Sequence, residues 1–211
     1  MNKAKIFILF ILFILCAANI YSQATIKILE ISMSNLGDGQ MYAHKYDEAK
    51  TPLEGKIRII TGFTTEYIDA DFKDGYAINK WEYYKNNKLA TIVNFTNGYL
   101  DGEFTELYPD GDIKEKGQYI KGQKNGIWET FKSDGIIKLT EIFDEGNLTK
   151  KITYYTDGKV DTERNFKTGK EEGLTRQYTW ESELKTEKNY VNGKQVGKQI
   201  QHMSRNVGNF V

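Results

Sequence analysis

The sequence contains few of the residues on which catalysis, metal binding and covalent cross-linking depend. Among its 211 residues are one cysteine, two histidines and two prolines. The cysteine, Cys16, lies in the apolar N-terminal segment, so the rest of the chain can form neither a disulfide nor a cysteine-based metal site. His44 and His202 have no metal-ligand spacing, and no nucleophile or phosphate-binding motif is present. We therefore expect a protein that is not an enzyme, with no catalytic residue, no metal and no cofactor.

The first 22 residues have the pattern of an export signal. Two lysines precede the run IFILFILFILCAA, which is shorter than the roughly 20 apolar residues of a membrane helix. Small residues favour cleavage after Ser22. Acylation at Cys16 is less favoured because Leu15 stands where the lipoprotein pattern has a small residue, and an uncleaved anchor is the other alternative. We expect residues 23–211 to be periplasmic, cell-envelope bound or secreted, with no integral membrane segment in the mature chain.

The charge of the mature chain gives no sign of nucleic-acid binding. The export segment contains two lysines and no acidic residue, so its removal leaves 27 basic and 29 acidic residues and a net charge of −2. Binding to nucleic acid requires clustered lysine and arginine that neutralise phosphates, and anionic membranes attract polybasic patches. We therefore expect no nucleic-acid partner.

Glycine and aromatic residues, by contrast, are abundant and recur in an internal repeat. Glycines return at intervals of 23 or 24 residues, at Gly75, Gly98, Gly122, Gly146, Gly169 and Gly193. A second turn position follows each by four residues, at Asn79, Gly102, Gly126, Lys150, Gly173 and Gly197. A further turn lies midway through each unit, and at Asp134-Gly135 we expect type I′ geometry, which requires positive φ at both central residues.

The residues between these turns predict strands. Aliphatic residues lie two positions after the midway turn, at Leu89, Ile113, Ile137, Val160 and Leu184. Aromatic residues lie eight positions after it, at Phe95, Tyr119, Phe143, Phe166 and Tyr190. Because the two offsets share parity, both sets are expected on one face of a half-buried strand. The repeat thus predicts an all-β fold, an elongated antiparallel meander of tandem hairpins of about 23–24 residues.

The repeat frame also divides the chain. Residues 51–72 match the repeat only in part and are expected to make a degenerate first hairpin. Residues 23–50 lack it and are expected to form an N-terminal cap on the exposed end strand. Residues 73–211 hold the regular repeats and end in a C-terminal cap, where His202 replaces the usual aromatic residue and no further strand can be completed.

The units TNGYLDGEFTELYPDGDIKEKGQY and IKGQKNGIWETFKSDGII resemble MORN-like repeats, in the bacterial variant NGxxxGxWxxYYxNG. The arrangement also resembles the YwqK-type antitoxin family, in which a leading DGxxY and TPxxGK segment precedes such repeats. Here DGQMY at 38–42 and TPLEGK at 51–56 match that segment, and the resemblance covers about residues 38–202. It implies an exported, non-enzymatic scaffold that binds another protein, as an antitoxin or immunity-like component opposite a toxin.

The repeat aromatics supply the candidate binding residues. The position two residues after the second turn position, hereafter the tryptophan slot, holds tryptophan or phenylalanine in three units and Ile152, Thr175 and Gln199 in later units. A binding surface built from this position would therefore lie in the first half of the chain. Three positions further on, a plain strand presents aromatic residues on the opposite face. Large exposed aromatics are common interface anchors, so the candidates are Trp81, Tyr84, Phe104, Trp128 and Phe131.

Two alternatives to this interpretation stay open. The aromatic residues could form a structural ladder that stacks strand against strand, without a binding role. The protein could also be a cell-envelope structural or glycan-binding module, in which the aromatic rings stack on sugars.

Overall fold

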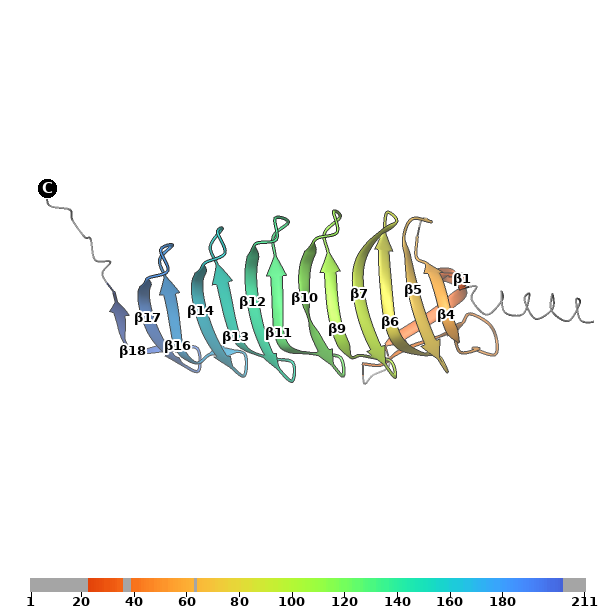
Figure 1. Cartoon of the computed structure of the whole chain (residues 1–211). Helices are drawn as coiled ribbons and strands as arrows, with labels where there is room; N and C mark the ends of the chain where they lie inside the picture. Colours follow the sequence, from red (N-terminus) through yellow and green to blue (C-terminus); the bar gives the residue numbers. More distant parts are fainter. Residues whose placement is uncertain (1–22, 36–38, 63, 203–211) are drawn as a thin grey trace, which may run out of the picture.

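The computed structural model describes residues 23–35, 39–62 and 64–202, which form one long sheet of 18 strands (Figure 1). The expected export signal, residues 1–22, and the last part of the expected C-terminal cap, residues 203–211, lie outside the described residues. Across the part of the chain that is described, no helix has the length and apolar character to cross a membrane. The expected all-β fold of tandem hairpins is confirmed.

In the described residues the strands follow one another along the chain, with one 3-10 turn, η1 (Ile28–Glu30), near the start. Their bounds are β1 (Ala24–Lys27), β2 (Ile31–Asn35), β3 (Met41–Lys45), β4 (Gly55–Ile60), β5 (Tyr67–Lys73), β6 (Tyr76–Lys85), β7 (Lys88–Thr96), β8 (Tyr99–Leu100), β9 (Gly102–Leu107), β10 (Ile113–Ile120), β11 (Gln123–Phe131), β12 (Ile137–Asp144), β13 (Asn147–Tyr154), β14 (Val160–Lys167), β15 (Lys170–Glu171), β16 (Gly173–Tyr178), β17 (Leu184–Val191) and β18 (Lys194–Gln201). From β4 onwards each long strand pairs antiparallel with the next long strand, and the two-residue strands β8 and β15 pair with β7 and β14. Hairpin tips line one long edge of the sheet and joining turns line the other (Figure 1).

The two kinds of turn differ in geometry. At the joining turns both central residues have positive φ, as at Asn97 (47°) and Gly98 (83°), and this is type I′ geometry. At the tip of the third unit only Gly135 has positive φ (79°), Gly135 N donates to Lys132 O, and Lys132 N donates to Ile136 O. The expectation of a type I′ turn at Asp134-Gly135 is therefore wrong, because the tip is a three-residue loop with glycine at its left-handed position.

Positive φ recurs at the second turn position, where it makes a bulge at the start of the strand. Asn79, Gly102, Gly126, Gly173 and Gly197 all have it, whereas Lys150 does not. In β13 the bulge lies instead between Leu148 and Lys150, and the strand reaches its tip one residue sooner.

This shortened strand changes which residue occupies the tryptophan slot of the fourth unit. Trp128 pairs with Glu141, and Glu141 pairs with Lys151. Paired residues of an antiparallel ladder project from the same face, so Lys151 occupies the position that corresponds to Trp128. The sequence spacing from the joining glycine had predicted Ile152 at this position. Ile152 pairs with Thr140 and faces the other side of the sheet.

A second bulge beside each tip of the regular repeats separates two residue sets that were expected on one face. In β7, Phe95 and Val93 lie on the face of Trp81, with which Val93 pairs. Leu89 pairs with Tyr84, on the far side of a register shift. The expectation of a common face is therefore wrong, because the bulge residue between positions two and eight changes the parity.

The N-terminal segment adds to the sheet in two ways. β1 pairs parallel with β4, with Ala24 opposite Ile57, and so lies beside the first strand of the meander. β2 and β3 form a hairpin that crosses the joining turns, where Met41 N donates to Gly98 O and Ala43 N donates to Gly75 O. The orange ribbon of this segment runs across the first hairpins in Figure 1.

The core lies between this hairpin and one face of the sheet in its first half. The buried cluster consists of Ile31, Ala43, Leu53, Ile57, Ile59, Ala70, Phe72, Ala77, Trp81, Val93 and Phe95. Beyond Phe95, the buried side chains in the described part of the chain are Trp128, Thr140 and Thr162. The second half is therefore held together mainly by strand pairing and by half-buried side chains on the two faces of a single layer.

Candidate binding surface

Trp81 and Trp128 are core residues. Trp81 is 0% exposed and packs between Phe72 and Phe95, with ring centroids 4.9 and 4.6 Å away. Trp128 is 2% exposed. Each indole nitrogen donates to a carbonyl of the preceding strand, Trp81 to Asp71 O at 3.1 Å and Trp128 to Gln118 O at 3.2 Å. The expectation that both are exposed anchors is wrong, because the preceding strand leaves room for an indole.

That room comes from small residues. A Cβ on Gly117 would overlap the ring of Trp128, so the indole lies against the Gly117 backbone. Ala70 precedes Asp71 as Gly117 precedes Gln118, and it holds the same place under Trp81. In the fourth unit, Glu141 and Lys151 stand at these two positions and form an ion pair at 3.0 Å.

Phe104 belongs to a smaller aromatic cluster around Trp128. Its ring centroid lies 5.1 Å from that of Trp128 and 5.9 Å from that of Tyr119. The ammonium of Lys124 lies 3.7 Å from the centroid of the indole. The cluster is thus closed by a lysine stem and a cation–π contact, and presents no exposed tryptophan.

Tyr84 and Phe131 lie on the other face. Tyr84 stacks on Tyr67 with centroids 4.5 Å apart, and its hydroxyl donates to Glu82 at 3.0 Å. The ring of Phe131 lies 5.4 Å from the ammonium of Lys116. The five predicted residues are therefore divided between two faces and form no common site, which agrees with the parity argument for a plain strand.

Two neighbouring tyrosines, Tyr83 and Tyr84, have raised pKa values. Burial raises the pKa of Tyr83 to about 12. The pKa of Tyr84 also rises to about 12, through burial and its hydrogen bond to Glu82. Both rings therefore stay neutral near pH 7 and act there as packing groups.

The face that carries Glu82 and Lys116, hereafter the open face, has an uninterrupted row of paired residues across the sheet. Each residue of the row is the register partner of the next, in the order Thr25, Arg58, Asp69, Glu82, Ile92, Thr105, Lys116, Glu129, Thr140, Ile152, Glu163, Arg176, Glu187 and Ile200. Ion pairs join Arg58 to Asp69 at 2.7 Å and Arg176 to Glu187 at 2.8 Å. The row therefore runs along the open face from β1 to β18.

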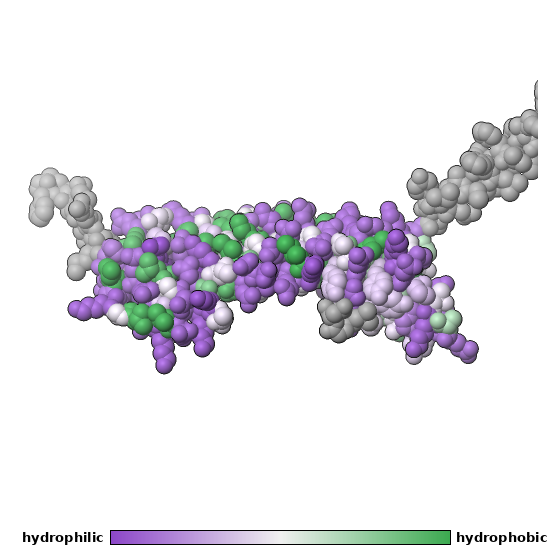
Figure 2. All heavy atoms as spheres, turned by 90° about the horizontal axis from the view of Figure 1, so that it is seen from below, coloured by the Kyte–Doolittle hydropathy of each residue, from purple (hydrophilic) through white to green (hydrophobic). Residues whose placement is uncertain are grey.

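Exposed aliphatic residues lie on this same face. Ile127 is two residues before Glu129 and is 59% exposed, and Ile200, within the row, is 54% exposed. Ile120, Leu174 and Val196 alternate onto the open face in the same way and are also exposed. Figure 2 shows that hydrophobic residues on the side seen from the joining turns form separate patches among hydrophilic ones. Sequence reasoning overlooked these residues because it searched for aromatic rings.

The opposite face, hereafter the tryptophan face, is polar in its second half. A hollow of about 250 Å³ there is lined by Thr162, Arg164, Glu171, Thr175, Gln177, Thr186, Lys188 and Tyr190. Arg164 pairs with Glu171 at 3.5 Å. The strands β14, β16 and β17 thus present several hydroxyl, amide and ammonium groups to the same small space.

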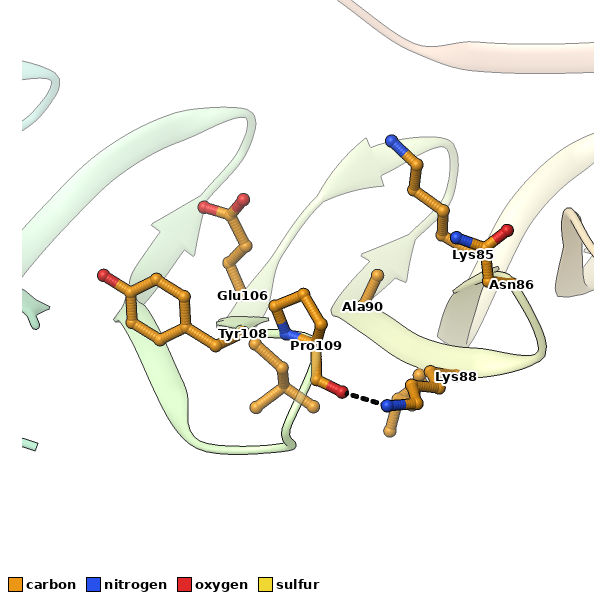
Figure 3. Close-up of a pocket in the computed structure, with 9 residues that line it drawn as sticks. Lys85, Asn86, Lys88, Ala90, Glu106, Tyr108 and Pro109 are labelled. Carbon is orange, nitrogen blue, oxygen red and sulfur yellow. Dashed lines mark hydrogen bonds between the residues drawn. The ribbon is translucent and has the colours of Figure 1, made fainter. Parts of the chain in front are cut away.

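A larger hollow of about 450 Å³, hereafter the tip hollow, lies between the first two hairpin tips of the regular repeats (Figure 3). Its lining consists of Lys85, Asn86, Lys88, Leu89, Ala90, Glu106, Leu107, Tyr108 and Pro109. Lys88 Nζ donates to Pro109 O at 2.8 Å and so bridges the two tips. A smaller hollow of about 290 Å³ lies beside it and shares Lys85 and Ala90. In the sequence this site is marked by the small residue Ala90. Other units have a lysine at the same position, namely Lys114, Lys138 and Lys185.

No group of three or more histidine, cysteine, aspartate or glutamate side chains in the described ranges is arranged to hold a metal ion. Asp69, Asp71 and Glu82 line one further hollow on the open face. Arg58 neutralises Asp69, Asn79 donates to Asp71 at 2.9 Å, and Lys80 pairs with Glu82 at 2.6 Å, so all three carboxylates already have partners.

No family model and no curated protein matches this chain. The solved structures that share limited similarity with it include the following two. A GtfA/B complex bound to UDP and GlcNAc is 14% identical, with a TM-score of 0.26 over 60% of this chain and 24% of that chain. A mutant of S. aureus TarM, in complex with fondaparinux, alpha-GlcNAc-glycerol and UDP, is 15% identical, with a TM-score of 0.28 over 57% of this chain and 21% of that chain. The present chain thus spans less than a quarter of either protein.

Proposed function

We propose that this protein is an exported, non-enzymatic β-repeat scaffold that binds another protein through its open face. The observation that carries the proposal is the set of exposed aliphatic side chains, led by Ile127 and Ile200, set among charged residues along one continuous row. Stacked repeats make extended surfaces of this kind, and apolar patches rimmed by charges are typical of protein interfaces. A toxin held by an antitoxin or immunity-like protein is the kind of partner that the resemblance to YwqK-type proteins implies.

The test begins with capture by the mature chain, residues 23–211, from envelope and secreted fractions of the native cell, with identification by mass spectrometry. The identified partner is then purified and titrated against the wild type and against Ile127→Asp. Because Ile127 is 59% exposed, the charge should leave the fold intact and weaken binding by at least about tenfold, or about 1.4 kcal/mol.

The matched control is Leu29→Asp, which places the same charge at an apolar residue that is 85% exposed and lies outside the open face. The control should bind as the wild type does. Equal weakening in both variants, or none in Ile127→Asp, would show that the partner does not use the open face.

A glycan-binding role has one observation in its favour, the polar hollow on the tryptophan face. Thr175, Gln177, Thr186, Lys188 and Tyr190 line it, and their side chains make no hydrogen bond or ion pair with other described residues. Free hydroxyl and amide groups beside one aromatic ring suit a sugar. Retention of wild-type protein on envelope polysaccharide, lost in Tyr190→Ala, would favour this function, and no retention would remove it.

A further inference from the structure

The tip hollow has a specific structural cause. The first tip is a two-residue turn, Asn86-Asn87, with φ of 52° and 59°, whereas the second is a three-residue loop closed by a hydrogen bond from Tyr108 N to Asp112 O. A short tip beside a long one leaves Pro109 and Tyr108 projecting past their neighbour. The difference in tip length is therefore one cause of the hollow.

Two side-chain differences keep the hollow open. Ala90 occupies a position that Lys114 fills in the next unit, where the lysine stem crosses the strand to reach Glu106 at 2.7 Å. Two later tips are each tied to the next unit by a tyrosine, where Tyr108 Oη donates to Phe131 O at 2.9 Å and Tyr155 Oη donates to Tyr178 O at 2.7 Å. Lys85 stands at the position of Tyr108 in the first unit and makes no such tie.

The walls of the hollow are apolar and its rim is positively charged. Leu89, Ala90, Leu107 and Pro109 supply the apolar lining. Lys85 and Lys88 form no ion pair with a carboxylate in the described ranges, while Glu106, the acidic residue of the lining, is neutralised by Lys114. An occupant that leaves no charge unpaired must therefore be apolar in its centre and acidic at its edge.

We propose that the tip hollow receives a segment of the protein partner in which a large apolar side chain is flanked by acidic residues. The volume of about 450 Å³ lies in the range of sites that bury a compact group of side chains. This inference rests on the proposed function and names the chemistry by which the partner is recognised, at a site separate from Ile127.

The experiment uses defined peptides with the full mature chain. Fluorescently labelled Gly-Asp-Phe-Asp-Gly is titrated by anisotropy beside two controls, Gly-Asn-Phe-Asn-Gly, which lacks the charge, and Gly-Asp-Ala-Asp-Gly, which lacks the ring. We expect both controls to bind at least about tenfold more weakly. Amide shifts of ¹⁵N-labelled wild-type protein, concentrated at Ala90 and Leu107, should place the peptide in the hollow.

Three variants complete the test. Ala90→Leu fills the hollow and should abolish peptide binding, and Lys85→Glu reverses the rim charge and should weaken it strongly. The matched control, Lys138→Glu, makes the same charge change at an exposed lysine of the third unit and should have no effect. Equal binding of the aspartate and asparagine peptides, or shifts that lie away from Ala90 and Leu107, would overturn the inference.

The failures of the two proposals are distinguishable. Partner binding that depends on Ile127 but survives Ala90→Leu would overturn the tip hollow as a recognition site and leave the scaffold function standing. Peptide binding at the hollow without any captured partner would overturn the proposed function, because the peptide test uses no native partner.

Discussion

The indole of Trp128 rests on the backbone of Gly117, at a distance that leaves no space for a methyl group between them. Gly117 has no positive φ, so the requirement for glycine there is steric and comes from the facing strand. At Trp128 the packing therefore requires glycine on the preceding strand, whereas the packing at Trp81 has room for the methyl group of Ala70.

Gly117→Ala should destabilise the protein by about 1–3 kcal/mol, because the added methyl group forces the indole out of its place. Urea denaturation followed by circular dichroism measures the loss. Gly62→Ala is the control, since a Cβ there would lie 3.5 Å from a flexible Glu66 oxygen, in ordinary contact. The double variant Gly117→Ala with Trp128→Phe should recover part of the loss, and additive losses would contradict the steric account.

Trp81→Ala should lower the free energy of unfolding by about 3–5 kcal/mol, because it empties the centre of the main core and leaves a cavity between Phe72 and Phe95. Its thermal midpoint should fall well below that of the wild type. A variant that kept the wild-type midpoint would show that Trp81 is not a packing residue.

Gly135→Val should cost about 1–2 kcal/mol through backbone strain alone, because φ is +79° and the space around a Cβ is open. Gly75→Ala should cost more, since its φ is +81° and a Cβ would also meet the ring of Tyr42 and lie 2.9 Å from Ala43 O. Gly135→Asn, which tolerates this conformation, serves as the control. The reverse order of the two losses in thermal melts would contradict the assigned contacts.

Stability should fall at high pH through the buried tyrosines. Tyr83 has a folded pKa of about 12, against about 10 in an unfolded chain, so the folded state holds its proton more tightly. The resulting stabilisation is fully present below pH 10 and is lost as pH rises towards 12. Tyr83→Phe should flatten this part of the curve of unfolding free energy against pH, and an unchanged slope would refute the role of Tyr83.

The glycine frame was sufficient to predict tandem hairpins and their order along the chain, because glycine at a joining turn is a local requirement for positive φ. It was not sufficient to place every residue on a face. One missing bulge residue before Lys151 moved Ile152 to the other side of the sheet, and the same kind of bulge separated Leu89 from Phe95. Parity counted along a sequence fails wherever a strand gains or loses one residue.

The burial of Trp81 depended on contacts that no local pattern contains. The hairpin of β2 and β3 packs on the core from a segment without the repeat, and Ile31, Ala43 and Leu53 complete the cluster. The tip hollow, in contrast, has two signals in the sequence: Ala90 stands where other units have lysine, and the turn at Asn86-Asn87 is shorter than the next one. Both signals are differences between units, and a search for aromatic residues that recur in every unit does not detect them.

The uneven core gives the stack a direction of unfolding. From β9 onwards each strand of the described chain pairs only with its neighbours along the stack, and all eight residues of β18 are exposed, whereas β4 to β7 are covered by a packed hairpin. In such a linear array the weak end opens first and the opening spreads one hairpin at a time. The molecule should therefore behave as a zipper anchored at its N-terminal end, in which the first hairpins keep their structure after the last ones have lost theirs.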